Sequence, residues 1–168
     1  EKGDNKGGGY FLHHKNKGMV IDPGFNFIDN FYEEGFKVAD IDAVLITHAH
    51  NDHTVDLESI LTLVYKYNDT IKDEIKEKYV NNNDINIKGE IDKAIKERGK
   101  KIDLYLNVGT FMKYSGWLNL KDSEEINNVT VLQPETTYQL NYFNGIKLHT
   151  TKSKHHEVID NKYVIGLI

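Results

Sequence analysis

The chain has 168 residues, of which 39% are hydrophobic and 28% charged, and its formal net charge at pH 7 is −5. These values are typical of one globular domain and exclude a largely disordered chain. Cysteine is absent, which excludes disulfides, thiolate metal ligands and cysteine nucleophiles. No apolar run approaches the roughly 18 residues needed to cross a bilayer, so we expect no membrane segment and a cytoplasmic location.

Two short apolar runs near the start predict a β-hairpin. They are residues 10–12 and 19–21, joined through residues 16–18. The proline and glycine of residues 22–24 should end the second strand, because proline lacks a ladder donor and glycine permits a turn. The strongest strand signal is residues 43–47, a continuous apolar and β-branched run typical of a strand buried on both faces.

The middle of the chain is predicted to be helical. Leucine, isoleucine and valine recur at helical spacing in residues 57–64. Thr70 with Asp73 resembles a capping box, and Ile71, Ile75 and Tyr79 continue a helical face. Residues 91–95 indicate another short helix, which Gly99 should end.

The rest of the chain alternates from strand to helix and then becomes β. Residues 102–108 are predicted to form a strand and residues 110–118 a helix. Four further strands are expected, at residues 129–132, 138–142, 146–150 and 163–168. Asn144-Gly145 is a strong signal for a hairpin turn. Strands, then helices, then strands indicate an α+β domain or a layered α/β/β domain.

We interpret residues 1–168 as one domain with a helical insertion at about residues 66–101. Lysine and acidic residues alternate in the insertion, which favours a solvated helical surface. The alternative is an arm or lid that touches the substrate or a partner subunit.

Three histidines and an aspartate follow the buried strand within six residues: His48, His50, Asp52 and His53. Neutral imidazole is the commonest biological ligand of zinc, and carboxylate oxygen binds the same ion. Alternate residues of an extended segment point the same way, so His48 and His50 can approach one metal together. Asp52 and His53 lie where the chain bends into the next helix, and they are placed to serve a second ion. We therefore expect two zinc ions, with manganese as the alternative.

Residues 47–53 resemble the T-H-x-H-x-D-H signature of the metallo-β-lactamase superfamily. Residues 19–24 are similar to the strand of that family that ends in Asp-x-Gly, and residues 41–46 to the strand that leads into its histidines. The resemblance implies a four-layer αββα sandwich.

The same resemblance implies a role for each residue of the cluster. His48 and His50 are implied to bind the first metal, and Asp52 and His53 the second. Asp52 is also expected to be the catalytic carboxylate. Asp22 is implied to support the ligands rather than to bind metal itself.

The family uses a third histidine on the first metal, after a later strand, and both His155 and His156 fit that place. The segment Lys-His-x-Glu followed by a strand favours His155. The spacing from His156 to Tyr163 resembles ribonuclease Z-like members and favours His156. We prefer His155 and keep both as candidates.

The resemblance covers only about the first two-thirds of a family domain. The bridging aspartate and the last histidine that the family uses for its second metal cannot be assigned to any residue here. We therefore expect a fold truncated before its C-terminal strands, and a natural protein that extends past Ile168.

The implied activity is that of a metal-dependent hydrolase whose nucleophile is a metal-bridged hydroxide. The substrate we expect is a phosphodiester, in RNA, a nucleotide or a small molecule, because residues 52–57 most resemble the ribonuclease Z-like branch. Hydrolysis of another ester class, such as a thioester or lactone, is the first alternative. A non-catalytic binding module with an incomplete site is the second. A homodimer is the assembly we consider.

Overall fold

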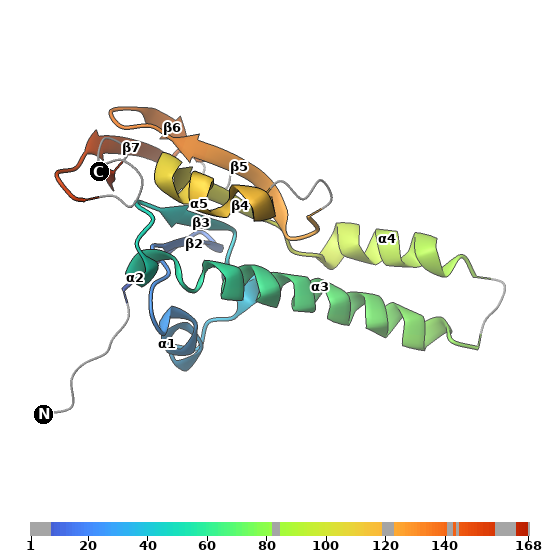
Figure 1. Cartoon of the computed structure of the whole chain (residues 1–168). Coiled ribbons are helices and arrows are strands. Elements are labelled where there is room, and N and C mark those ends of the chain that lie inside the picture. Colours follow the sequence, from blue (N-terminus) through green and yellow to red (C-terminus); the bar gives the residue numbers. More distant parts are fainter. Residues whose placement is uncertain are drawn as a thin grey trace, which may run out of the picture.

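The computed structural model describes residues 8–81, 85–118, 123–140, 143, 145–156 and 164–167 (Figure 1). Its strands are β1 (Tyr10–His14), β2 (Lys17–Ile21), β3 (Ala43–Ile46), β4 (Ile102–Asn107), β5 (Ile126–Leu132), β6 (Thr137–Gln139), β7 (Lys147–Lys152) and β8 (Ile165–Leu167). Its helices are α1 (Phe27–Glu33), a 3-10 turn η1 (Val38–Asp40), α2 (Asn51–Thr54), α3 (Leu57–Tyr79), α4 (Ile87–Arg98) and α5 (Val108–Leu118). Among the described helices, none is both long and apolar enough to cross a membrane.

Strands β1 to β5 form one sheet in chain order. The predicted hairpin of β1 and β2 is confirmed, although its turn lies at Lys15 and Asn16, not at residues 16–18. Both turn residues have positive φ, as a tight two-residue hairpin turn requires, while Gly18 lies inside β2. Strands β2 to β5 run parallel to one another.

The central strand β3 is buried along its whole length because both faces of its sheet are covered. Val44 and Ile46 belong to the core on the helical side, with side chains from α1, α3 and α5. Ala43 and Leu45 belong to a second core, on the opposite face. The predicted strand is therefore confirmed, together with the reason for its unbroken apolar character.

The second core lies between the five-stranded sheet and a smaller sheet of β6, β7 and β8. Phe143, Leu148 and Ile165 contribute to it from the smaller sheet's segment of the chain. The structure thus has helices, a large sheet and a small sheet in that order, which confirms the α/β/β layering and matches three layers of the expected sandwich. The described residues hold no helix after α5 that would form the fourth layer.

The strands predicted in the last third are present with different bounds: the strand expected at residues 129–132 is the longer β5, and the one expected at residues 146–150 is β7. The strand expected at residues 138–142 is β6, and residues 141 and 142 lie outside the described part. Residue 144 also lies outside it, while Gly145 has the positive φ that a hairpin turn needs. Strand β8 confirms the last predicted strand over Ile165–Leu167.

Helices α3 and α4 lie side by side as an antiparallel pair that extends beyond the edge of the sheet (Figure 1). The predicted capping box at Thr70 is wrong, because α3 runs unbroken from Leu57 to Tyr79, whereas the helical face predicted to continue to Tyr79 is confirmed. The Thr70 hydroxyl instead donates to the carbonyl of Lys66, one turn earlier in the same helix. The helix expected to end at Gly99 is confirmed as α4. Whether residues 66–101 are an insertion stays an interpretation.

A buried carboxylate joins three segments at the end of the sheet where β3 begins. Asp42 accepts hydrogen bonds from Lys17 Nζ at 3.2 Å, Lys100 Nζ at 2.8 Å and the Gly18 amide at 3.0 Å. Burial alone would raise the pKa of Asp42, but the bonds from Lys100, Gly18 and Lys17 outweigh it and hold the pKa below its ordinary value. This cluster fixes the start of β3, while the other end of the strand carries the histidines.

Candidate metal centre

The histidine segment begins where β3 ends. Thr47 to His50 form a loop, and His50 immediately precedes the short helix α2. In open sheets of parallel strands, binding sites form outside the carboxyl ends of the strands. The position of the predicted cluster is therefore the position at which this topology places a site.

A hydrogen-bonded chain connects Asp22 to the ring of His48 through Thr47. The Thr47 amide donates to Asp22 Oδ1 and the Thr47 hydroxyl to Asp22 Oδ2, both at 2.7 Å. The same hydroxyl oxygen lies 2.9 Å from His48 Nδ1. Because the single hydroxyl proton is directed to Asp22, the oxygen accepts from Nδ1–H, so that Nε2 is the nitrogen His48 offers as a ligand.

Asp22 is held in this position by its backbone as well as by its side chain. It has a φ of 50°, and its amide donates to the carbonyl of Leu45 at 2.8 Å. Burial raises the pKa of Asp22, against the opposing effect of the hydrogen bonds from Thr47 and the nearby His53. Both carboxylate oxygens are engaged by Thr47, which is consistent with the supporting role expected for Asp22.

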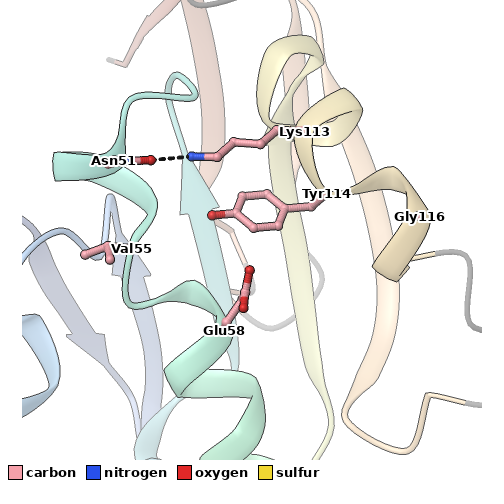
Figure 2. Close-up of a pocket in the computed structure, with 6 residues that line it drawn as sticks. All are labelled: Asn51, Val55, Glu58, Lys113, Tyr114 and Gly116. Atoms are coloured by element: carbon pink, nitrogen blue, oxygen red, sulfur yellow. Dashed lines mark hydrogen bonds between the residues drawn. The ribbon is translucent and has the colours of Figure 1, made fainter.

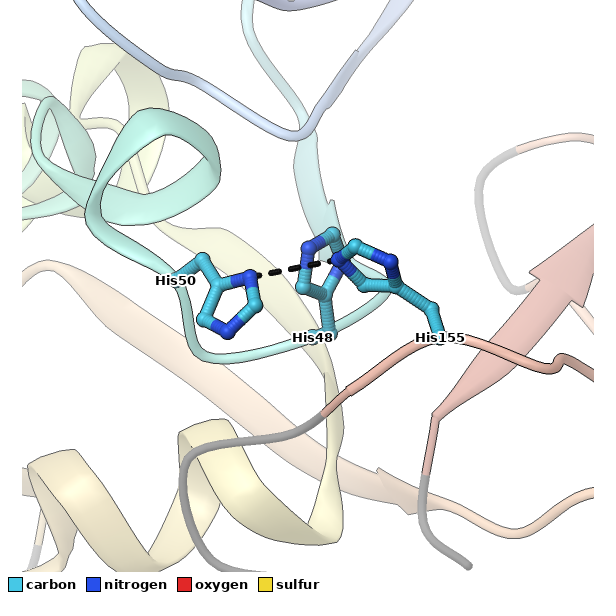
Figure 3. Close-up of side chains that lie close together, drawn as sticks. All are labelled: His48, His50 and His155. Carbon is cyan, nitrogen blue, oxygen red and sulfur yellow. Dashed lines mark hydrogen bonds between the residues drawn. The ribbon is translucent and has the colours of Figure 1, made fainter. Parts of the chain in front are cut away.

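Three imidazoles converge on one point beyond the sheet. His48, His50 and His155 each offer a nitrogen, and these atoms lie within 4.8 Å of one another. His155 Nε2 is 3.3 Å from His50 Nδ1, and the three rings lie close together (Figure 3), with 4.7 to 5.1 Å between their centroids. His48 is buried, His50 half-buried and His155 exposed, so the group is closed beneath and open to solvent. Three histidine nitrogens with an open side form a ligand set that suits zinc in a catalytic site.

A second potential ligand group consists of Asp22, His48 and His53. His53 Nδ1 lies 3.2 Å from Asp22 Oδ2, and His53 Nε2 lies 3.7 Å from Asp52 Oδ2. Asp52 is adjacent to this group and exposed. Asp52 therefore lies next to His53, as expected for two ligands of a second ion. The described residues bring no third ligand to this pair.

The structure distinguishes the two histidines that the sequence left as alternatives. His155 belongs to the group with His48 and His50, whereas the neighbouring His156 is exposed and belongs to neither ligand group. Elsewhere, His149 Nδ1 lies 2.9 Å from Thr137 Oγ1 across the β6–β7 hairpin. The arrangement supports the preference for His155, and metal binding by any of these residues stays a prediction.

Gly24 packs directly against the histidine segment, a contact that the sequence did not reveal. A Cβ added at Gly24 would lie 1.8 Å from the carbonyl oxygen of Asp52. The carbonyl of Pro23 also accepts a hydrogen bond from the Asp56 amide at 3.0 Å. The turn after β2 and the helix after β3 therefore touch backbone to backbone, and only glycine fits between them.

A cleft of about 530 Å³ lies beside the histidine segment, between the start of α3 and α5 (Figure 2). Its lining residues come from the helices on both sides, and they are Asn51, Val55, Glu58, Lys113, Tyr114 and Gly116. Lys113 reaches from α5 toward the histidine segment and donates to Asn51 Oδ1 at 2.8 Å. No sequence pattern singled out this lysine.

Comparison with known proteins agrees with this architecture. A family model of the metallo-beta-lactamase superfamily matches residues 9–64, which include β1 to β3 and the whole histidine segment. Solved structures align with almost the entire chain. YhfI from Bacillus subtilis, a metallo-beta-lactamase fold protein, has a TM-score of 0.57 at 13% identity, over 91% of this chain and 47% of that one. The chain has the metallo-β-lactamase fold.

Two further solved structures with this fold differ in their described activities. A diphosphatase from the PhnP family aligns with a TM-score of 0.59 at 19% identity, over 95% of this chain and 47% of its own. BJP-1, a subclass B3 metallo-beta-lactamase of Bradyrhizobium japonicum, aligns with a TM-score of 0.50 at 18% identity, over 94% and 48%. No curated protein sequence matches the chain.

The chain spans about half the length of the solved structures it matches. The resemblance to the metallo-β-lactamase superfamily and the partial coverage expected from the sequence are thereby confirmed. In this fold the histidine motif of residues 47–53 lies at the carboxyl end of a central strand, where the structure has placed it.

Proposed function

We propose that this chain forms the metal-binding part of a metal-dependent hydrolase, with a first zinc ion bound by His48, His50 and His155. The observation that carries the proposal is the convergence of three imidazole nitrogens within 4.8 Å. His155 comes from a segment far along the chain, so local sequence cannot account for its position beside His50. Without a shared cation, two such ring nitrogens facing each other at 3.3 Å gain only a weak contact.

The residues around this group keep the ligand nitrogens correctly oriented. The Thr47 hydroxyl donates to Asp22 and accepts from His48 Nδ1. This contact holds the His48 ring with Nε2 toward the metal. Such supporting contacts set ring orientation and basicity in metal sites.

We assign Asp52 and His53 to a second ion, with Asp52 as the catalytic carboxylate. Their side chains lie side by side, with 3.7 Å between Asp52 Oδ2 and His53 Nε2. The resemblance implies that this ion also takes a bridging aspartate and a last histidine, neither of which can be assigned to a residue of this chain. When bound, a pair of metal ions supplies Lewis-acid catalysis and activates water at neutral pH.

The substrate class we propose is a phosphodiester, in RNA, a nucleotide or a small molecule. The local likeness of residues 52–57 to the ribonuclease Z-like branch supports it, as does the description of one structural neighbour as a diphosphatase. A thioester or lactone is the alternative substrate, and a non-catalytic binding module is the alternative function.

Metal binding is tested by measuring zinc content and affinity in the wild-type chain and in His48→Ala. We expect about one zinc per wild-type chain and a loss of most of it in His48→Ala. His149→Ala is the matched control, because it removes an imidazole that lies in neither ligand group. A wild-type chain that binds no zinc or manganese above the histidine pKa would contradict the proposal.

The reaction class is tested on the full-length natural protein that contains this chain. A chromogenic phosphodiester, a thioester and a β-lactam are assayed side by side with added zinc or manganese. Activity on the phosphodiester supports our assignment. Activity only on the thioester would establish the first alternative, and metal binding without any hydrolysis would favour the binding module.

A further inference from the structure

The ammonium group of Lys113 makes three hydrogen bonds to the segment that carries the histidines. Lys113 Nζ lies 3.0 Å from the carbonyl oxygen of Ala49 and 2.9 Å from Thr54 Oγ1. It also lies 2.8 Å from Asn51 Oδ1, the contact drawn in Figure 2. An ammonium has three donors and no acceptor, so this geometry uses all of them. One side chain of α5 thus contacts both ends of the segment between His48 and α3.

The contact with Thr54 extends to the backbone of a ligand residue. The Thr54 hydroxyl donates to the carbonyl of His50 at 3.1 Å, while its oxygen accepts from Lys113. Thr54 is fully buried, and its own carbonyl accepts a hydrogen bond from Tyr114 OH at 3.4 Å. Lys113 therefore acts on His50 through Ala49 on one side and through Thr54 on the other.

The apolar packing of α5 is made by residues other than Lys113. The helix contacts the core through Phe111 and Tyr114, and Lys113 is an exposed residue whose side chain lies along the surface. Among the residues that the structure describes, the acceptors of its ammonium all belong to the histidine segment. Replacing Lys113 should therefore remove hydrogen bonds to the histidine segment without removing core contacts of α5.

We propose that Lys113 is a positioning residue that holds the His50 main chain in the conformation needed for metal binding. This inference rests on the proposed metal site. It has a distinctive consequence, because a positive charge near a cation site opposes binding by Coulomb repulsion. If charge dominated, removing Lys113 would strengthen metal binding. If positioning dominates, as we infer, removing it weakens metal binding.

The test compares zinc affinity, measured by competition with a chromogenic chelator, in the wild type and Lys113→Met. Methionine keeps the length and apolar stem of the side chain but none of its donors. We expect the zinc Kd to rise about 10-fold or more, in the range seen when a supporting contact of a metal ligand is lost. Lys113→Arg retains charge and donors and should restore the Kd to within about 3-fold of the wild type.

Two further measurements separate positioning from folding. The d–d absorption of cobalt bound to Lys113→Met should differ from that of the wild type, whereas the thermal midpoint of the metal-free chain should change little. Lys96→Met, at an exposed lysine near the end of α4, is the matched control and should leave the Kd unchanged. Should Lys113→Met fail to fold, Asn51→Ala removes one acceptor of the same ammonium and should still raise the Kd.

An unchanged or lower Kd in Lys113→Met, with the wild type binding zinc, would overturn this inference and leave the proposed function intact. Failure of the wild type to bind any metal would overturn both. A raised Kd in Lys113→Met that Lys113→Arg reverses would support the inference.

Discussion

The hydroxyl oxygen of Thr47 lies 2.9 Å from Nδ1 of His48. This contact fixes which nitrogen of the buried imidazole is presented at the end of the central strand. A hydroxyl between a carboxylate and an imidazole orients the ring in the way that a direct carboxylate contact does in other metal sites. The threonine of the motif therefore orients the His48 ring from the loop that follows β3.

Replacing Thr47 with valine should weaken zinc binding about 10- to 100-fold, because valine keeps the shape and removes the hydroxyl. Thr47→Ser keeps the hydroxyl and should bind zinc nearly as the wild type does. The measurement is zinc Kd by chelator competition. Thr137→Val is the matched control, since Thr137 makes the same kind of contact, also at 2.9 Å, with His149 outside the ligand groups. Equal affinity in Thr47→Val and wild type would refute this account of the contact.

Single alanine replacements should separate His155 from His156. His155→Ala is expected to lose most bound zinc, because His155 faces His50 in the three-histidine group. His156→Ala should retain it, because His156 belongs to neither group. Zinc content after gel filtration distinguishes the two variants. The reverse pattern would show that His156 is the ligand.

Gly24→Ala should destabilise the chain by about 1–3 kcal/mol, the range for forcing an extra methyl group into a packed site. The new Cβ would overlap the Asp52 carbonyl oxygen, so the histidine segment must move. Urea unfolding measures the change, and zinc affinity should fall as well. Gly116→Ala, inside α5 with nothing within 4 Å of its added Cβ, is the control and should stabilise by up to about 1 kcal/mol.

Asp42→Asn should lower the free energy of unfolding by about 1–3 kcal/mol at pH 7, because it weakens the bonds from Lys17, Lys100 and the Gly18 amide. The pKa of Asp42 in the folded chain lies below the ordinary value of 3.8. Its ionised form therefore stabilises the fold fully above pH 3.8, and this stability is lost as the pH falls through the lower folded pKa.

The measurement is urea unfolding of the wild type and Asp42→Asn at neutral pH and at about pH 3, where the difference between them should shrink. Glu74→Gln breaks an exposed ion pair with Arg98 and should cost at most about 0.5 kcal/mol at neutral pH. A wild-type advantage that stays constant down to pH 3 would show that charge on Asp42 does not cause it.

The elements with the strongest local signals could be predicted from the sequence. The apolar run of β3 and the helical spacing of apolar residues at the start of α3 both mark side chains that are buried in the core. The histidine cluster could be predicted because His48, His50 and His53 lie within six residues of one another in the sequence.

Other features depend on partners that are distant in sequence. Thr70 carries a capping signal, but the helical packing of Val64 and Ile71 on either side of it maintains α3 through that position. His155 and Lys113 reach the histidine segment across 105 and 59–64 residues respectively. Such a contact cannot be predicted from a local sequence pattern, because it depends on which strands and helices are neighbours in the fold.

The 105-residue separation between His50 and His155 has a thermodynamic consequence. A metal ion held by both residues is a reversible cross-link that closes a loop including most of the chain, and such a link removes conformational entropy from the unfolded state. Among the described residues, the two sheets are otherwise joined near this point by apolar packing and by a backbone hydrogen bond from the Ile165 amide to the Thr47 carbonyl. Occupation of the site should therefore fasten the small sheet to the large one, and chelation should loosen strands β7 and β8 before it affects the helical layer.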